Sequence, residues 1–151
     1  MNITELTVRE LQEKLKNKEL TITEITKAYT DRITEKEEDV EAFVTILSEQ
    51  ASKQARKIEE KVNSGEIVGD FAGIPIGIKD NVCTKGVKTT CSSRMLENFI
   101  APYNATVVEK LNSENIVSLG KLNMDEFAMG ASTEYSAFKK TKNPWNLNTT
   151  P

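Results

Sequence analysis

Lys79 is the first residue of this sequence whose type and position could do chemistry. It follows an apolar run, Ile-Pro-Ile-Gly-Ile at 74–78, which is typical of a short buried strand. Burial disfavours the charged ammonium, so a lysine at the end of a buried strand can become neutral and act as a general base. The alternative is that Lys79 begins an exposed turn with Asp80. The local pattern alone favours the exposed turn, because most lysines are exposed.

The chain contains no histidine. This absence excludes Ser-His-Asp and Cys-His arrangements and imidazole metal sites within these residues. Acid-base chemistry would fall to lysine, aspartate, glutamate or tyrosine, which strengthens the case for Lys79 without deciding it.

A run of small residues is the second candidate for chemistry. It consists of Met129, Gly130, Ala131 and Ser132. Small side chains would let backbone N–H groups approach a substrate, although the same composition is common in plain turns. The preceding acids, Asp125 and Glu126, are adjacent and therefore diverge on a helix or a strand, which is poor geometry for a paired-carboxylate site. We expect them at the start of a helix instead.

Helices and strands alternate along the chain and must position these residues. Capping boxes that start at Thr7 and Thr21 predict two N-terminal helices, and a third is predicted from Ser48 to a stop at 63–65. A short amphipathic helix is predicted at 95–99, and a longer one after Asn104. Strands are predicted at 43–47, 74–78 and 116–119.

The order strand, helix, strand from 74 to 119 predicts a right-handed βαβ unit with parallel strands. Sites in such sheets lie at the carboxyl ends of strands, and both Lys79 and Lys121 follow strands. For Lys121 an ordinary turn is favoured, because the preceding strand is short and the lysine follows a glycine. The sequence therefore predicts an α/β fold with N-terminal helices packed on a partial, largely parallel or mixed sheet.

Composition limits the functional classes. The 151 residues suffice for one domain. The net charge is −3 and there is no long basic block, so we do not expect this chain alone to bind nucleic acid. It has neither an apolar stretch of membrane-span length nor a signal-like N-terminus, so we expect a soluble cytoplasmic protein. Cys83 and Cys91 are too few for a zinc site of the paired-Cys kind and are expected to be free thiols. The polar C-terminal loop is expected to be anchored by a buried Trp145.

Several sequence blocks resemble, in order and spacing, the amidase signature enzymes. The block GIPIGIKDNV is similar to these amidases in general. Four further blocks resemble one subgroup, the A subunits of tRNA-dependent amidotransferases: TKGVKTTCSSRML, FIAPYNATVVEKL, NMDEFAMGASTEYSAF and NPWN. The resemblance extends over essentially the whole chain and implies the amidase signature fold.

The resemblance implies a Ser-cis-Ser-Lys triad, in which Lys79 matches the catalytic lysine. The two serines are expected in a Gly/Ser-rich stretch directly after this sequence. The chain, residues 1–151, is then the N-terminal part of a single amidase domain and is expected to be inactive alone. The segment 129–132 would lie beside the substrate. Ala131 replaces a common serine there and Tyr135 a common asparagine, so a backbone contact at Ala131 is expected rather than one through a hydroxyl.

The resemblance also implies partners. The complete enzyme would hydrolyse glutamine and pass ammonia to a B subunit, which uses ATP and Mg²⁺ to convert Glu-tRNA(Gln) to Gln-tRNA(Gln), with a small C subunit joining the two. This chain would bind no cofactor or metal itself, would meet tRNA only through the complex, and would have no membrane partner. Two alternatives remain open: a broad-specificity amidase that works without tRNA, and a truncated, non-catalytic paralogue that acts as a binding module.

Overall fold

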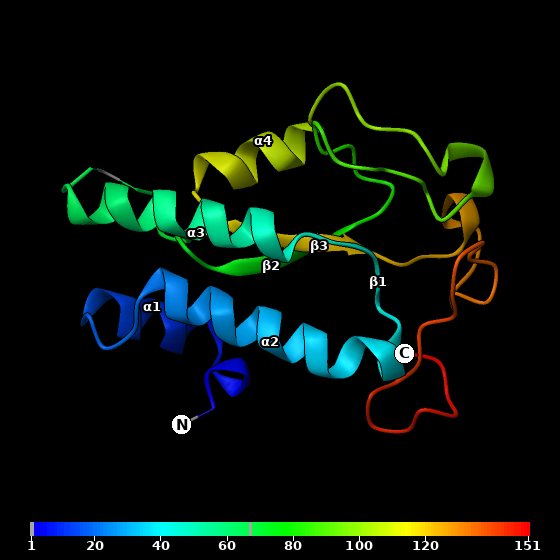
Figure 1. Cartoon of the computed structure of the whole chain (residues 1–151), viewed down its shortest axis with the longest axis horizontal. Coiled ribbons are helices and arrows are strands. Elements are labelled where there is room, and N and C mark those ends of the chain that lie inside the picture. Colours follow the sequence, from blue (N-terminus) through cyan, green and yellow to red (C-terminus); the bar gives the residue numbers. More distant parts are fainter. Residues whose placement is uncertain (1, 67) are drawn as a thin grey trace. The chain divides into compact units, whose positions relative to one another are not determined.

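The computed structural model describes residues 2–66 and 68–151. It contains helices and a small sheet (Figure 1). The α-helices are α1 (Val8–Lys16), α2 (Ile22–Val40), α3 (Ser48–Asn63) and α4 (Thr106–Ser113). The strands are β1 (Phe43–Ile46), β2 (Pro75–Lys79) and β3 (Val117–Leu122), and short 3-10 turns span Ile3–Glu5, Arg94–Leu96 and Glu126–Ala128. Among the described helices, none combines the length and apolarity that crossing a membrane requires.

The predicted capping boxes are confirmed. The Thr7 side chain accepts the N–H of Glu10, whose carboxylate accepts the Thr7 N–H at 2.7 Å. Thr21 and Glu24 exchange the same pair of contacts at the start of α2, at 3.1 and 2.9 Å. Reciprocal caps satisfy N–H groups that the first turn of a helix leaves without a partner, so these helix starts were readable from local sequence.

The sheet has the strand order β1-β3-β2 and is mixed. β1 runs antiparallel to β3, with Thr45 opposite Lys121 and an irregularity between Phe43 and Thr45. β2 runs parallel to β3: Val117 N–H donates to Ile74 O at 2.9 Å, and at the other end Asp80 N–H donates to Leu122 O at 3.0 Å. The predicted α/β class with a mixed sheet is confirmed.

Two compact units divide the chain. The first contains the described residues of Met1–Ile33, Leu47–Ile76 and Lys110–Leu119. Its core joins α1, α2 and the residue before β2 through buried Leu11, Ile25 and Ile74. On α3 the small residues Ala51 and Ala55 are fully buried.

The second unit contains Thr34–Ile46, Gly77–Glu109 and Gly120–Pro151. It is mostly loops, and polar side chains provide much of its buried interior. These are Asp80, Thr89, Thr90, Ser92, Ser93, Lys121 and Asp125. A loop-rich unit of this kind depends on hydrogen bonds from buried groups, because buried polar atoms are costly unless paired.

Two local predictions in the second unit were wrong. Trp145 is 95% exposed rather than a buried anchor. Its turn is closed by asparagine side chains, such as the 2.9 Å bond from Trp145 N–H to Asn143 Oδ1, and so needs no aromatic packing. The helix predicted at 95–99 is only the 3-10 turn Arg94–Leu96, and Met95 is exposed.

Candidate active site

Lys79 is the last residue of β2, and its side chain is exposed. Side chains alternate along a strand, so buried Ile78 and exposed Lys79 point to opposite faces. The Lys79 carbonyl accepts the N–H of Val82 at 3.0 Å, which closes a tight turn. The exposed turn that the local pattern favours therefore describes the position of Lys79, and the burial considered for it is not observed.

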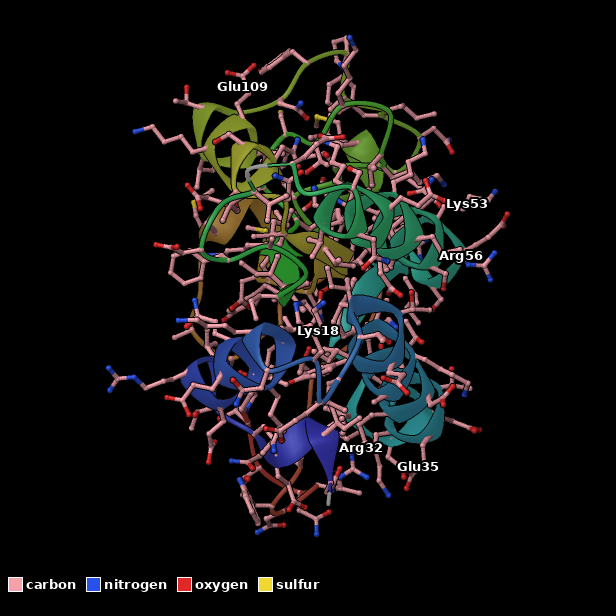
Figure 2. All side chains as sticks on the ribbon, turned by 90° about the vertical axis from the view of Figure 1, so that its left-hand side faces the viewer. Lys18, Arg32, Glu35, Lys53, Arg56 and Glu109 are labelled. Atoms are coloured by element: carbon pink, nitrogen blue, oxygen red, sulfur yellow. The ribbon has the colours of Figure 1, made fainter. Side chains whose placement is uncertain are left out.

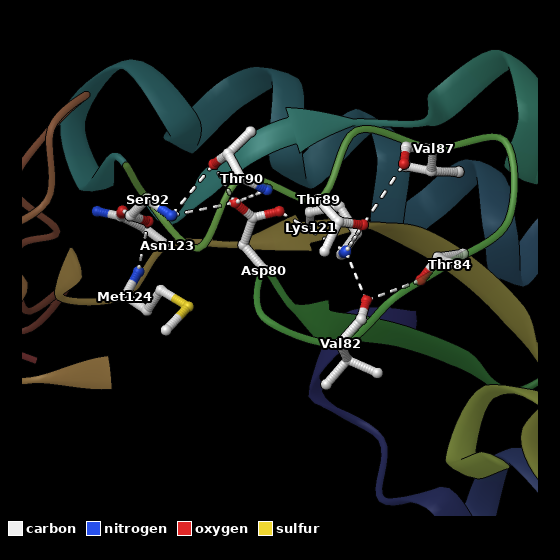
Figure 3. A network of polar contacts seen from close by, with 10 residues as sticks. All are labelled: Asp80, Val82, Thr84, Val87, Thr89, Thr90, Ser92, Lys121, Asn123 and Met124. Carbon is white, nitrogen blue, oxygen red and sulfur yellow. Dashed lines mark hydrogen bonds and ion pairs between the residues drawn. The ribbon is translucent and has the colours of Figure 1, made fainter. Parts of the chain in front are cut away.

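Asp80 points to the opposite side and is fully buried. Its Oδ2 accepts the N–H of Thr90 at 3.0 Å and that of Ser92 at 3.4 Å, and also the hydroxyl of Thr90 (Figure 3). Cys91 and Ser92 both have a φ of 50°, a left-handed conformation that few non-glycine residues adopt. Successive N–H groups in such a turn form a concave site for an anion, which the Asp80 carboxylate fills.

Lys121 lies within β3 and is fully buried, so its predicted role as a turn residue was wrong. Its Nζ donates to Val82 O at 2.8 Å and to Thr89 Oγ1 at 3.0 Å, and lies 3.6 Å from Asp80 Oδ1. Burial lowers the pKa of Lys121, and the Asp80 charge opposes that shift. The sequence signal was ambiguous because Gly120, which resembles a turn residue, instead allows β1 to approach: a Cβ on it would lie 2.4 Å from Thr45 O.

Ser92 and Asn123 connect this turn to the rest of the second unit. The Ser92 hydroxyl donates to Asn123 Oδ1 at 3.0 Å and accepts the Met124 N–H at 3.3 Å. Asn123 in turn donates to Lys139 O at 2.9 Å and to Thr141 Oγ1 at 3.0 Å. The network therefore extends from Asp80 into the segment that contains the small-residue run.

Asp125 organises that segment. It is 5% exposed, and its carboxylate accepts three N–H groups at 2.9 to 3.0 Å, from Ser132, Thr133 and Tyr135. These hydrogen bonds, that of Tyr135 first, lower the pKa of Asp125, and the charge of Lys79 adds to the effect. Asp125 does precede a 3-10 turn as predicted, but its carboxylate does not cap that turn.

Within the predicted substrate segment, 129–132, the Asp125 carboxylate holds Ser132. Met129 is 73% exposed, Gly130 and Ala131 are also exposed, and Ser132 is half-buried. Because Lys79 acts electrostatically on Asp125, which binds Ser132, the structure brings the candidate base and the end of this segment into one neighbourhood. Both the amine of Lys79 and the residues Met129, Gly130 and Ala131 are exposed. Sequence reasoning missed Asp80, Asn123 and Asp125 as the supports of this arrangement.

The two cysteines and the surface of α3 lie outside the predicted site residues. Cys83 and Cys91 are free thiols, as predicted, and burial raises the pKa of the Cys91 thiol. Within 2–66 and 68–151, no three Cys, Asp or Glu side chains gather as metal ligands would. On α3, Lys53 and Arg56 project outward beside two shallow hollows of about 270 and 180 Å³, and neither hollow contains a predicted site residue (Figure 2).

Comparisons with known proteins agree on one family. The family model described as Amidase matches residues 24–151. The chain is 54% identical over 151 residues to the A subunit of the glutamyl-tRNA(Gln) amidotransferase of Thermoanaerobacter pseudethanolicus, and the match covers all of this chain and 31% of that relative. The chain thus spans about a third of the length of the curated relatives it matches.

Solved structures share the fold. The chain superposes on the A subunit of the glutamyl-tRNA(Gln) amidotransferase of Thermotoga maritima with a TM-score of 0.72 and 35% identity, covering 97% of this chain and 29% of the other. It superposes on a bacterial aryl acylamidase of the amidase signature family with a TM-score of 0.89 and 26% identity, covering 96% and 30%. The predicted amidase signature fold is confirmed.

Proposed function

This chain belongs to the amidase family, and we propose that the protein containing it is the glutaminase component of a tRNA-dependent amidotransferase. That protein would release ammonia from glutamine for the conversion of Glu-tRNA(Gln) to Gln-tRNA(Gln). The observation that carries the proposal is the 54% identity to the A subunit of such an enzyme over the whole chain, against 26% to an aryl acylamidase of the same fold.

Lys79 is the proposed base. A serine hydroxyl must lose its proton to attack the amide carbon of glutamine, and this chain has no histidine to accept it. Lys79 would take the proton of a bridging serine, which in turn takes that of the nucleophilic serine. Lys79 would return this proton through the bridging serine to the amide nitrogen, which leaves as ammonia as the acyl-enzyme forms, and water would then release glutamate. Both serines would come from a part of the protein that this chain does not span.

The run Met129–Ser132 is the proposed substrate-binding segment. The Ser132 N–H is already bound to Asp125, and the Ser132 hydroxyl donates to Glu134 Oε2 at 2.9 Å. The Met129 N–H likewise donates to Glu126 O at 3.1 Å, so the backbone of the exposed Gly130 and Ala131 is the part that a glutamine amide can reach. Ala131 offers a backbone contact in place of a hydroxyl.

The proposed partners follow from the same similarity. A B subunit would bind ATP and Mg²⁺ and amidate the tRNA-linked glutamate, and a C subunit would complete a heterotrimer in the cytoplasm. This chain would bind no cofactor and would meet tRNA only through the complex.

The test uses the full-length protein and measures glutamate and ammonia released from glutamine. Lys79→Ala is expected to lower kcat about 100-fold or more while the fold and KM are retained, as for loss of a general base. Lys85→Ala, which removes an exposed lysine outside the proposed site, is the matched control. Retained activity in Lys79→Ala would remove Lys79 from the mechanism.

A broad-specificity amidase is the second candidate, favoured by the TM-score of 0.89 with the aryl acylamidase. An acylated aniline and glutamine, offered to the same preparation, separate the two. Faster hydrolysis of the aryl amide, without co-purifying subunits, would favour this second candidate.

A further inference from the structure

The turn that follows Lys79 is held from inside the protein by Lys121. The ammonium of Lys121 donates to Val82 O at 2.8 Å and lies 3.6 Å from Asp80 Oδ1 (Figure 3). Val82 N–H in turn donates to Lys79 O at 3.0 Å. One buried amine therefore contacts the first and the third residue after the proposed base.

The backbone of β3 holds the same turn at a second point. Asp80 N–H donates at 3.0 Å to the carbonyl of Leu122, the residue next to Lys121. With the carbonyl of Val82 and the carboxylate of Asp80 both fixed, the backbone at Lys79 has little freedom to rotate. The direction in which the Lys79 side chain leaves the strand is therefore set by contacts on the opposite, buried face.

Stability alone does not explain this pair. Within the described chain Asp80 Oδ1 accepts no hydrogen bond, so the charge of Lys121 is what compensates it there. The cost of removing two charges from water offsets most of their attraction, and buried ion pairs are often replaceable by apolar residues without loss of stability. Such a pair is better explained by the geometry that it imposes.

We propose that Lys121 is a positioning residue for Lys79, acting through Asp80 and Val82 on the turn between them. Lys121 itself touches no substrate. The proposal rests on the proposed function, because it requires that Lys79 is the general base whose orientation Lys121 fixes.

The test compares two neutralised pairs in the full-length protein. Asp80→Asn/Lys121→Met removes both buried charges together and leaves no isolated one. Glu49→Gln/Lys53→Met removes an exposed pair on α3, at 2.5 Å in the native chain, as the matched control. For the first variant we expect cooperative unfolding, a KM for glutamine within about threefold of wild type, and a kcat at least about tenfold lower, as misplacement of a catalytic group predicts. The control should change none of these.

Hydrogen exchange at the Val82 amide provides a readout that needs no activity. If Lys121 holds the turn, this amide exchanges faster in Asp80→Asn/Lys121→Met and normally in the control. Wild-type protein that fails to hydrolyse glutamine would defeat the proposed function, while Val82 exchange would still decide the positioning role. A folded double variant with full kcat and unchanged Val82 exchange would overturn the inference.

A milder pair of variants covers the case in which the double variant does not fold. Thr89→Val removes one acceptor of Lys121 and keeps both charges, whereas Thr89→Ser keeps the hydroxyl. We expect faster Val82 exchange and a lower kcat in Thr89→Val and wild-type values in Thr89→Ser. Equal values in both would also overturn the inference.

Discussion

Gly130 and Asp125 are so close that no side chain fits between them: a Cβ on Gly130 would lie 2.3 Å from Asp125 Cγ. The carboxylate can therefore sit inside the loop and accept the N–H groups of Ser132, Thr133 and Tyr135. The proposed substrate segment thus depends on a glycine at its second position.

Gly130→Ala should weaken substrate binding more than it slows chemistry. The added methyl must displace the Asp125 carboxylate, which loosens the N–H groups it binds and shifts the segment. In the full-length protein we expect KM for glutamine to rise about tenfold, with kcat reduced less, as for a contact made equally in ground and transition states. Gly86→Ala is the control, since a Cβ there meets nothing within 4 Å. An unchanged KM in Gly130→Ala would show that the segment does not bind substrate.

Acid should release the loop that Asp125 holds. The pKa of Asp125 is lowered in the folded protein, so its contribution to stability is complete above the ordinary carboxyl pKa of about 3.9 and is lost as pH falls through the lower, folded value. The difference in unfolding free energy between wild type and Asp125→Asn should therefore be largest at neutral pH and shrink below about pH 4. Chemical denaturation from pH 7 to pH 2 measures it, with Glu126→Gln as the neighbouring control. A difference that stays constant over this range would contradict the role of the ionised carboxylate.

Gly73 allows Ile22 to pack closely against the backbone in the first unit. A comparison with Gly86 distinguishes the cost of losing this packing from the cost of backbone strain. Both glycines have positive φ, at 79° and 77°, so alanine strains the backbone equally at each. Only at Gly73 does the added Cβ meet an atom, Ile22 Cγ1 at 2.5 Å. Gly73→Ala should cost about 1–3 kcal/mol more in unfolding free energy than Gly86→Ala, the usual cost of overpacking. Thermal or urea unfolding checks this, and equal costs would mean that Ile22 moves aside freely.

The local parts of this fold could be predicted from the sequence. The capping boxes at Thr7 and Thr21 involve residues three apart, so the local sequence identifies both partners of each contact. The parallel pairing of β2 and β3 followed from the order strand, helix, strand, whereas the antiparallel pairing of β1 with β3 did not. The position of Lys79 at a strand end was also predicted, and so was its exposure, which the local pattern favoured because most lysines are exposed.

The supports of the candidate site could not be predicted in the same way. Ser92 bonds Asn123 across 31 positions, and Lys121 reaches Val82 across 39. Periodicity and capping rules carry no information about such pairs. The predicted burial of Trp145 was wrong for a related reason. An aromatic residue is buried only if residues distant in the sequence cover it, and the sequence of its own turn does not identify those residues.

Lys79 and Lys121 occupy opposite environments although they lie on neighbouring strands, one exposed and one fully buried. An amine-selective acylating reagent added to the folded protein therefore reaches the first and is kept from the second. Labelling at Lys79 then reports whether the proposed site is occupied, and labelling at Lys121 reports whether the second unit has opened. The two amines together form an internal probe that distinguishes ligand binding from loss of structure in a single peptide map.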